Sequence, residues 1–371
     1  MGYNPSHTPM RVLMTADTVG GVWTYATELC LALAPHGIRV ALATMGAPLR
    51  PEQRAVLEAL PNVDVFESTY KLEWMDEPWE DVEAAGAWLL DIERQFLPDV
   101  IHLNEYAHGH LAWQTPVLIV AHSCVYSWFE AVRGCVPTPD WARYRVEVMH
   151  GLRCADLVTA PTQAMLQALL RHYGPFKAGP VVFNGRQAED YPPGLKEPFI
   201  LTAGRVWDEA KNVGILDRIA PRISWPIYVA GEQHHPDGHG KAVFGGLQHL
   251  GRLTPEQLAD RMAAASIYVL PARYEPFGLS ALEAALAGCA LVLGDIESLR
   301  EVWGDAALFV PPHDGAAIEK ALRSLIEDDA LRVQLASRAR QRALRFTPER
   351  MATGYLDLYG KLAARGSPCP V

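Results

Sequence analysis

The feature that most constrains the fold is an alternation of strand-length and helix-length segments that runs through half of the chain and then starts again. The first apolar run, RVLMTA at residues 11–16, leads through a Gly-Gly turn into a helical pattern. After the linker-like stretch YPPGLKEP at 191–198, PFILTAGRV at 198–206 has the pattern of a new first strand. Strands that alternate with helices predict a parallel sheet covered on both faces. We therefore expect two doubly wound α/β domains.

The expected strands are short apolar runs spread through both halves. They are residues 11–16, 38–44, 63–66, 100–103, 117–121, 157–160 and 181–183 in the first half, and 198–206, 226–230, 267–270, 290–293 and 307–310 in the second. The length of 371 residues suits two domains of roughly 100–200 residues each. Two such domains place a ligand in the crevice between the carboxyl ends of their strands.

Several protein classes share this architecture, so the fold alone does not decide the function. Periplasmic binding proteins, two-domain dehydrogenases and nucleotide-sugar glycosyltransferases are examples. A dehydrogenase is disfavoured, because VGGVWT at residues 19–24 lacks the G-x-G-x-x-G dinucleotide fingerprint. GHGKA at 238–242 lacks the earlier glycine and the Ser or Thr of a P-loop, so we expect no phosphate site there.

Charge and cysteine content exclude other classes. The formal charge is −10, and acidic residues outnumber basic ones in both halves, so a general electrostatic grip on nucleic acid is not expected. The six cysteines include no C-x-x-C pair, which favours reduced thiols over a disulfide framework or a zinc site. No apolar run approaches the roughly 18 residues that a membrane helix needs. We expect a cytoplasmic protein with at most peripheral contact with the inner membrane.

The segment YEPFGLSALEAALAG at residues 274–288 carries the sharpest chemical signal. Glu275 precedes a helix that opens near Gly278 and Leu279, and Glu283 lies two turns further on. The backbone amides of Phe277, Gly278 and Leu279 are expected to be free and to face an anion such as a phosphate. Carboxylates repel a phosphate, so we expect Glu275 to hold sugar hydroxyls and Glu283 to hold ribose hydroxyls. The alternative is an acid that merely favours the helix dipole.

A second segment, TAGRVWDEAKN at residues 202–212, supplies two cations. Arg205 follows the first strand of the second half, and Lys211 lies at the start of the next helix. A planar fork and a point charge at the mouth of a sheet suit a diphosphate. The alternative is a set of surface ion pairs, Arg205 with Asp208 or Lys211 with Glu209.

Together these two segments resemble the retaining glycosyltransferases of family 4, which have the GT-B fold. In that family a Glu-x7-Glu element, here Glu275 and Glu283, and an upstream Arg/Lys pair, here Arg205 and Lys211, hold a nucleotide-diphosphate sugar. The resemblance spans nearly the whole chain. It implies a donor site in the second domain and an acceptor side in the first.

Other segments extend the resemblance. VGGVWT matches the family's glycine-rich first turn, which implies that Gly20 and Gly21 pass close to the diphosphate and the transferred sugar. IVAHS at 119–123 matches a strand-end histidine, which implies that His122 touches the donor sugar. FTPERMATGYLDLYGKL at 346–362 resembles the last helix, which crosses back onto the first domain. The implied Rossmann-like domains are 1–190, to which 347–371 returns, on the acceptor side, and 191–346 on the donor side.

The chain also departs from the family pattern. VVFNG at residues 181–185 matches, but the family usually continues with Val-Asp where this chain has Arg186 and Gln187, and we assign these two residues no role. Arg205 and Lys211 are also one residue further apart than is common in relatives.

No cofactor and no metal are expected. The chain has no D-x-D sequence, which holds a metal-bridged diphosphate in the other major glycosyltransferase architecture. His102, His108 and His110 lack helical i, i+4 pairing and a neighbouring ligand set, so structural roles are expected. Arg205, Lys211 and the helix start are expected to offset the charge of the diphosphate instead.

The resemblance implies that a hexose is transferred, with retention of configuration, to a hydroxyl of a glycan or lipid-linked acceptor, as in polysaccharide biosynthesis. UDP-hexose is the first candidate donor and GDP-mannose the second. Two rivals stay open at this point, a GT-B nucleotide-sugar epimerase and a non-catalytic nucleotide-sugar binder.

The acceptor is expected to meet the first domain. Asp17 and Glu105 lie in strand-end loops there and could bind its hydroxyls. Aromatic side chains that could stack on sugar rings lie in the same loops, although core packing is the alternative for them. They are Trp23, Tyr25, Tyr106, Trp113, Tyr126 and Trp128.

Overall fold

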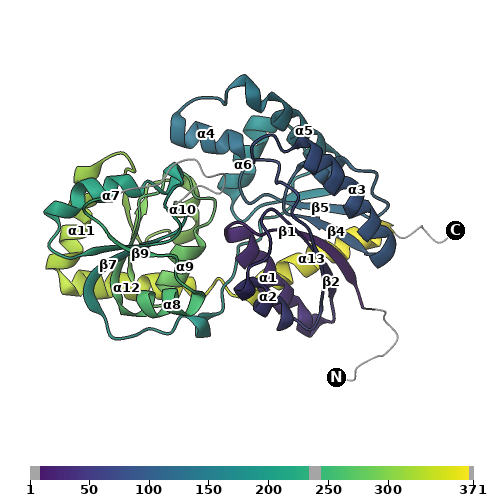
Figure 1. The fold of residues 1–371 in the computed structure, drawn as a ribbon. Coiled ribbons are helices and arrows are strands. Elements are labelled where there is room, and N and C mark those ends of the chain that lie inside the picture. Colours follow the sequence, from purple (N-terminus) through teal and green to yellow (C-terminus); the bar gives the residue numbers. More distant parts are fainter. Residues whose placement is uncertain (1–8, 234–243, 367–371) are drawn as a thin grey trace.

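The computed structural model describes residues 9–233 and 244–366, which form two domains side by side (Figure 1). Each domain contains one six-stranded sheet, ordered β3-β2-β1-β4-β5-β6 in the first and β12-β11-β10-β7-β8-β9 in the second. All described strand pairs are parallel. Counted from its own first strand, each sheet has the 3-2-1-4-5-6 order of the doubly wound fold. The predicted fold class is confirmed.

The first domain is built around β1 at its centre. Its strands are β1 (Arg11–Asp17), β2 (Arg39–Met45), β3 (Val63–Glu67), β4 (Val100–Leu103), β5 (Val117–Val120) and β6 (Leu157–Thr159). Its α-helices are α1 (Gly21–Leu33), α2 (Pro51–Glu58), α3 (Trp79–Phe96), α4 (Val125–Arg133), α5 (Ala142–Cys154) and α6 (Gln163–Tyr173). Short 3₁₀ turns are η1 (Ala34–His36), η2 (Ala107–His110), η3 (Pro139–Trp141) and η4 (Ala188–Asp190).

The second domain repeats this plan around β7. Its strands are β7 (Glu197–Ala203), β8 (Ile227–Ala230), β9 (Gln248–Gly251), β10 (Ala265–Leu270), β11 (Ala290–Gly294) and β12 (Leu308–Val310). Its α-helices are α7 (Val213–Ile219), α8 (Pro255–Ala264), α9 (Leu279–Leu286), α10 (Glu297–Trp303), α11 (Gly315–Glu327) and α12 (Asp329–Ala343), and its 3₁₀ turns are η5 (Glu209–Lys211) and η6 (Ala220–Arg222).

Each sheet separates two apolar cores. In β1, Val12 and Met14 pack on one face against α1, while Leu13 packs on the other against α3, α5 and α6. In the second domain, Leu201 and Ile200 of β7 divide in the same way between α9 on one face and α7 with α11 on the other. This alternation follows from the pleat of a strand, and it explains why strands buried on both faces are apolar throughout.

The last helix, α13 (Pro348–Gly366), lies on the first domain although it follows the second in sequence (Figure 1). Its Met351, Tyr355 and Tyr359 are buried in the core that contains α1. The chain therefore crosses between the domains twice. One crossing segment joins α6 to β7 and the other joins α12 to α13. The two segments touch at Gly185, where only glycine fits, because a Cβ there would lie 2.3 Å from the carbonyl oxygen of Thr347.

The strands differ from the expectation at two places. Residues 181–183 form no strand; they lie beside β6, where the ladder is broken because Pro180 has no amide donor. The strand β9 was not expected from the sequence, since QHLG is short and half polar. The GHGKA stretch at 238–242 lies outside the described residues. Among the helices that are described, none is long and apolar enough to cross a membrane.

Candidate active site

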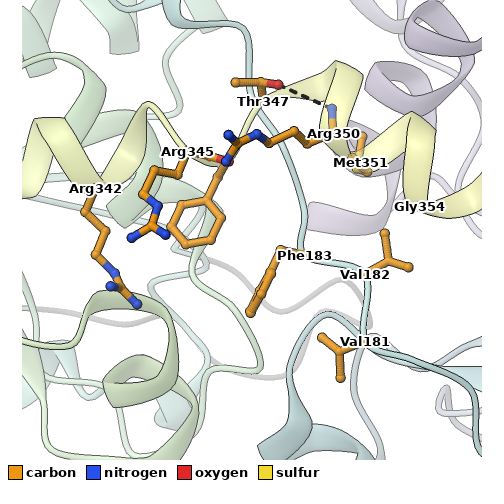
Figure 2. Close-up of a pocket in the computed structure, with 10 residues that line it drawn as sticks. Val181, Val182, Phe183, Arg342, Arg345, Thr347, Arg350, Met351 and Gly354 are labelled. Atoms are coloured by element: carbon orange, nitrogen blue, oxygen red, sulfur yellow. Dashed lines mark hydrogen bonds between the residues drawn. The ribbon is translucent and has the colours of Figure 1, made fainter.

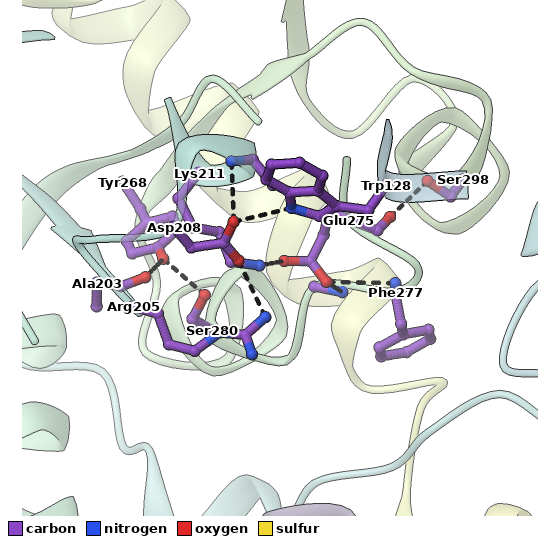
Figure 3. Close-up of polar contacts among 12 residues, drawn as sticks. Trp128, Ala203, Arg205, Asp208, Lys211, Tyr268, Glu275, Phe277, Ser280 and Ser298 are labelled. Carbon is purple, nitrogen blue, oxygen red and sulfur yellow. Dashed lines mark hydrogen bonds and ion pairs between the residues drawn. The ribbon is translucent and has the colours of Figure 1, made fainter. Parts of the chain in front are cut away.

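In the loop after β7, the predicted cation Arg205 forms an ion pair with a buried carboxylate, Asp208 (Figure 3). Asp208 Oδ1 accepts a hydrogen bond from the amide of Ala210 at 3.0 Å, which caps η5, and Oδ2 lies 3.0 Å from Nη2 of Arg205. Burial opposes the charge of Asp208, but the positive charges of Arg205 and Lys211 hold its pKa below the ordinary value. Asp208 is therefore an anion that fixes the direction of Arg205.

Lys211 pairs with Glu275, 64 residues away in sequence. Its Nζ lies 2.6 Å from Oε2 of Glu275, and both side chains are largely shielded from solvent. The other oxygen of Glu275 accepts hydrogen bonds from the amides of Gly278 at 3.0 Å and Phe277 at 3.5 Å. The Ser298 hydroxyl donates to the backbone carbonyl of Glu275 at 2.6 Å. The carboxylate is thus held between a cation and the start of α9.

The expectation of free amides at this helix start is wrong for two of the three residues. Glu275 folds back onto the amides of Phe277 and Gly278, because the first amides of a helix have no partner within the helix and a carboxylate just upstream can satisfy them. The Leu279 amide has no hydrogen-bond partner among the described residues. An anion that binds here has to compete with Glu275.

Of the ion pairs considered as alternatives, only one forms. Arg205 does pair with Asp208, although Asp208 is buried and the pair is no simple surface contact. Glu209 pairs with Arg133 of α4 at 2.7 Å and not with Lys211. Because Trp128 of α4 also donates from Nε1 to Asp208 at 3.0 Å, the loop after β7 is tied to the first domain at two points.

The glycine turn of the first domain faces these groups. Gly20 has φ 118° and ψ −151°, a conformation essentially restricted to glycine, and it opens α1. A Cβ on Gly20 would lie 3.7 Å from Nη1 of Arg205, and one on Gly21 would lie 3.7 Å from Leu279. The structure therefore brings Gly20, Gly21, Arg205 and Leu279 to one place between the domains.

His122 follows β5 on the first-domain side. Its Nε2 lies 2.8 Å from Oδ1 of Asn104, and its ring centroid is 4.4 Å from that of Tyr25. Desolvation lowers the pKa of His122 to about 3, so the ring is neutral at ordinary pH. Asn104 donates from Nδ2 to the carbonyl of Thr15 at 2.6 Å, which orients its Oδ1 toward His122. His122 Nε2 therefore carries the proton.

The other three histidines are held by protein groups. His102 contacts the hydroxyl of Tyr359 through Nδ1 at 2.6 Å, and His108 contacts Glu105 through Nδ1 at 3.1 Å. His110 stacks on His150 with ring centroids 4.4 Å apart. Over residues 9–233 and 244–366, no group of three or more His, Cys, Asp or Glu side chains has an arrangement that could hold a metal ion.

Asp17 lies near Arg205 and near Glu105 on the first-domain side. Burial raises the pKa of Asp17 to about 7, while the hydrogen bond from the Val19 amide and the charge of Arg205 oppose this rise and Glu105 adds to it. Glu105 accepts a hydrogen bond from the Thr15 hydroxyl at 2.7 Å. Asp17 thus lies in the field of Arg205 across the domain boundary, next to a second carboxyl group, Glu105.

The aromatic residues of this region mostly serve the core. Four of them, Trp23, Tyr25, Tyr106 and Tyr126, are buried. Trp113 uses its Nε1 to donate to the carbonyl of His108, and Trp128 uses its Nε1 for Asp208. Packing, the alternative considered from the sequence, accounts for the four buried side chains.

Glu283 has a partner that sequence reasoning missed. It is buried, and its Oε1 lies 3.0 Å from Nε of Arg186, the residue to which no role was assigned. The same guanidinium contacts Glu28 of α1 and the hydroxyl of Tyr191. Glu283 is therefore separate from the Lys211–Glu275 pair. The sequence indicated this partner only indirectly, because Arg186 occupies a position where the family usually has Val.

The described part of the chain also has a cavity of about 340 Å³ where the two crossing segments meet (Figure 2). It is lined by Val181, Val182, Phe183, Arg342, Arg345, Phe346, Thr347, Arg350, Met351 and Gly354. None of the predicted site residues lines it.

Two family profiles together span most of the chain. Residues 19–187 match the family described as "Glycosyltransferase Family 4", and residues 191–342 match "Glycosyl transferases group 1". The two matches meet at the linker between the two sheets.

Known proteins resemble the chain over nearly its full length. A glycogen synthase from Mycobacterium tuberculosis is 27% identical over 96% of this chain and 95% of its own. The sucrose-phosphate synthase structure from Thermosynechococcus elongatus superposes with a TM-score of 0.81 at 21% identity, covering 96% of this chain and 100% of that one. Anabaena HepE, solved with UDP-glucose, superposes with a TM-score of 0.73 at 17% identity and coverages of 95% and 100%.

Proposed function

Because the chain belongs to the GT-B glycosyltransferases of family 4 and takes its sugar from a nucleotide donor, we propose that this sugar is a hexose carried by UDP. GDP-mannose is the second candidate. The structural similarity to HepE, which was solved with UDP-glucose, supports the order of the two. The acceptor is a hydroxyl of a glycan or of a lipid-linked glycan.

The observation that carries the proposal is the group formed by Arg205, Lys211 and Glu275 opposite Gly20. Two fixed cations suit the diphosphate. The glycines of the turn have no Cβ, so the backbone of the turn can come close to the diphosphate. When a phosphate takes Lys211, Glu275 loses its cation. Its Oε2 is then available to accept a hydrogen bond from a sugar hydroxyl.

The reaction breaks the bond between the anomeric carbon and the diphosphate oxygen. The departing diphosphate gains negative charge, which Arg205 and Lys211 stabilise. The acceptor hydroxyl bonds to the anomeric carbon on the face that the diphosphate leaves, and its proton passes to a diphosphate oxygen. Configuration is then retained. Proton NMR of the fresh product tests this step, and an inverted anomer would refute it.

His122 fits a contact with the donor sugar. Since its Nε2 donates to Asn104, its Nδ1 is left as an acceptor for a sugar hydroxyl. The neutral ring adds no charge to the sugar as positive charge develops there. Glu283 is assigned to the ribose hydroxyls, as the resemblance implies.

Transfer is proposed to need no metal, because Arg205 and Lys211 can carry out the charge stabilisation that a divalent ion would supply. Turnover measured with and without EDTA tests this. Equal rates are expected, whereas loss of activity that magnesium or manganese restores would contradict it.

A thermal-shift screen of UDP-, GDP- and ADP-sugars tests the donor assignment. A ligand that binds the native state raises the melting temperature, and more so the tighter it binds. UDP-hexoses should give the largest shift, followed by GDP-mannose. A larger shift with an ADP-sugar would overturn the donor assignment.

A further inference from the structure

Arg186 joins two helices and a loop residue through one guanidinium. Its Nη1 contacts Glu28 of α1, its Nε lies 3.0 Å from Glu283 of α9, and its Nη2 contacts the hydroxyl of Tyr191. The side chains of Arg186, Glu28 and Glu283 are only 12%, 8% and 10% exposed. The guanidinium is buried together with two carboxylates and a tyrosine hydroxyl. Removing one charged partner would leave a buried charge unpaired, which is strongly destabilising.

The backbone of Arg186 is as firmly placed as its side chain. Its amide donates to the carbonyl of Phe346 at 3.1 Å, where the two crossing segments touch. Arg186 therefore lies between the two domains. It contacts Glu28 of the first domain and Glu283 of the second.

Glu283 needs such a partner to recognise a ribose. A carboxylate accepts hydrogen bonds with both oxygens only while it is ionised, and a protonated one gives up part of that capacity. Burial works against the ionised form and raises the pKa of Glu283, while Arg186 and the Tyr191 hydroxyl lower it. Nε of Arg186 lies close to Oε1 of Glu283 but makes no hydrogen bond with it. Arg186 therefore acts on Glu283 mainly through its positive charge.

We propose that Arg186 is a positioning residue for nucleotide recognition: it keeps Glu283 negatively charged and aimed at the ribose hydroxyls, and Glu28 anchors the guanidinium from the first domain. This inference rests on the proposed function, because it takes Glu283 as the ribose-binding residue. It assigns a use to the position at which the chain departs from its family.

All the charged and titratable groups that face Glu283 enter the expected pH response. They are Arg186, Glu28, Asp190, Tyr191 and Tyr268. Arg186 is the one cation among them in the described structure. Without it, Glu283 becomes protonated at a higher pH than in the native protein, so ribose recognition weakens as the pH falls and recovers as it rises.

The test compares nucleotides with and without ribose hydroxyls. Calorimetry gives dissociation constants for UDP and GDP and for their 2′-deoxy and 3′-deoxy forms, from pH 6 to pH 9. The native protein should bind the preferred parent nucleotide about tenfold or more tighter than its deoxy forms, with little dependence on pH. Arg186→Met should reduce this ratio to about two at pH 7, and the ratio should grow as the pH is raised.

Three further variants separate positioning from a structural role. Arg186→Lys keeps a cation without the planar fork, so it should retain the flat pH dependence and part of the discrimination. Arg186→Met combined with Glu283→Gln should show weak discrimination at every pH. Glu28→Gln should give a ratio between those of the native protein and Arg186→Met. Melting temperatures of all variants report whether they are folded.

The outcomes distinguish the two levels of the proposal. If the native protein binds UDP and GDP no better than their deoxy forms, the ribose role of Glu283 fails, and this inference with it. If the native protein discriminates and Arg186→Met keeps the same ratio at every pH, the role of Arg186 alone is refuted. If Arg186→Met does not fold, unchanged discrimination in both Arg186→Lys and Glu28→Gln would refute it.

Discussion

At the scale of single residues, the buried carboxylate of Asp208 decides how the candidate donor site is organised. It holds Arg205, caps η5 and accepts from Trp128 of the first domain. An exposed ion pair contributes little to stability, whereas a buried carboxylate with three donors fixes geometry. We infer that Arg205 is held ready for a diphosphate before any donor arrives.

Replacing Asp208 by Asn should therefore weaken donor use. The amide oxygen can still accept from Trp128 and Ala210, but the charge that holds Arg205 is lost. We expect the donor KM to rise about tenfold, equivalent to ~1.4 kcal/mol. Initial rates over a range of donor concentrations measure it. Glu209→Gln, which removes the exposed partner of Arg133, is the control and should leave KM unchanged. An Asp208→Asn enzyme with the native KM would contradict this role.

Asp17 predicts a change in stability with pH. Its pKa is raised to about 7 in the folded protein from an ordinary 3.8, so the folded state holds a proton that the unfolded state releases in this range. Stability contributed by this group is present at low pH and is lost as the pH rises from about 4 to 7.

The Asp17→Asn variant removes this loss. Its melting temperature relative to the native protein should be higher at pH 8 than at pH 5, as measured by differential scanning fluorimetry. Glu58→Gln, at an exposed carboxylate, is the control and should show no such difference. A difference for Asp17→Asn that does not change with pH would refute the assignment.

The sequence indicated residues that follow predicted strands, but it did not indicate the contacts of Arg186. Arg205, Lys211 and Glu275 were singled out because their loops follow predicted strands, and the structure brings them together. The two carboxylate partners of Arg186, Glu28 and Glu283, lie 158 and 97 positions away in sequence, on helices of different domains. Nothing in the neighbouring residues indicates such contacts, because they depend on how the two domains meet.

At the scale of elements, the starts of α1 and α9 shape the site through their glycines. Gly20 opens α1 and Gly278 opens α9, and both have positive φ values of 118° and 90°. Side chains are rarely tolerated in these conformations. The apolar strands were well predicted from their composition, whereas β9 was missed because its residues carry no apolar pattern.

Gly20→Ala should affect both stability and donor binding. The conformation at Gly20 is strained for any side chain, at a cost of about 1–3 kcal/mol, and relief of the strain would move the turn that faces Arg205. Urea denaturation and the donor KM measure the two effects.

Gly37→Ala provides the matched control for Gly20→Ala. Gly37 also has positive φ, but a Cβ there meets nothing within 4 Å, so stability should fall by about 1 kcal/mol while the donor KM stays native. Equal donor KM values for the two variants would show that the glycine turn is not part of the site.

At the scale of the whole molecule, the chain passes between the two domains twice, and the two segments pack closely where they meet. The segment that follows α6 passes the segment before α13 at Gly185, next to Thr347, and α13 then completes the core around α1. The restart of the βα pattern predicted two sheets, and the family resemblance implied the return of the last helix. Pattern alone could not foresee the contact at Gly185, since it depends on two backbones that are far apart in sequence.

Gly185→Ala should destabilise the protein by several kcal/mol, about 3 or more, because the new Cβ would overlap the carbonyl of Thr347 at 2.3 Å and both crossing segments would have to shift. Gly360→Ala makes the same chemical change in an exposed turn of α13 with open space around it, and should instead stabilise by about 0.5–1 kcal/mol. Denaturant unfolding of both variants measures these effects. Similar effects of the two substitutions would refute this account of the crossing.

The most direct test of the central claim is the release of nucleoside diphosphate from UDP-glucose, and from GDP-mannose in parallel, in the presence of a mixed pool of glycan and lipid-linked acceptors. The native protein should release the diphosphate in an acceptor-dependent manner. Glu275→Ala should reduce this release by about 100-fold or more, since the contact between the carboxylate and the sugar is lost, while melting temperature confirms that the variant is folded. If Glu275→Ala releases the diphosphate at the native rate, the donor site does not lie where Lys211 meets Glu275.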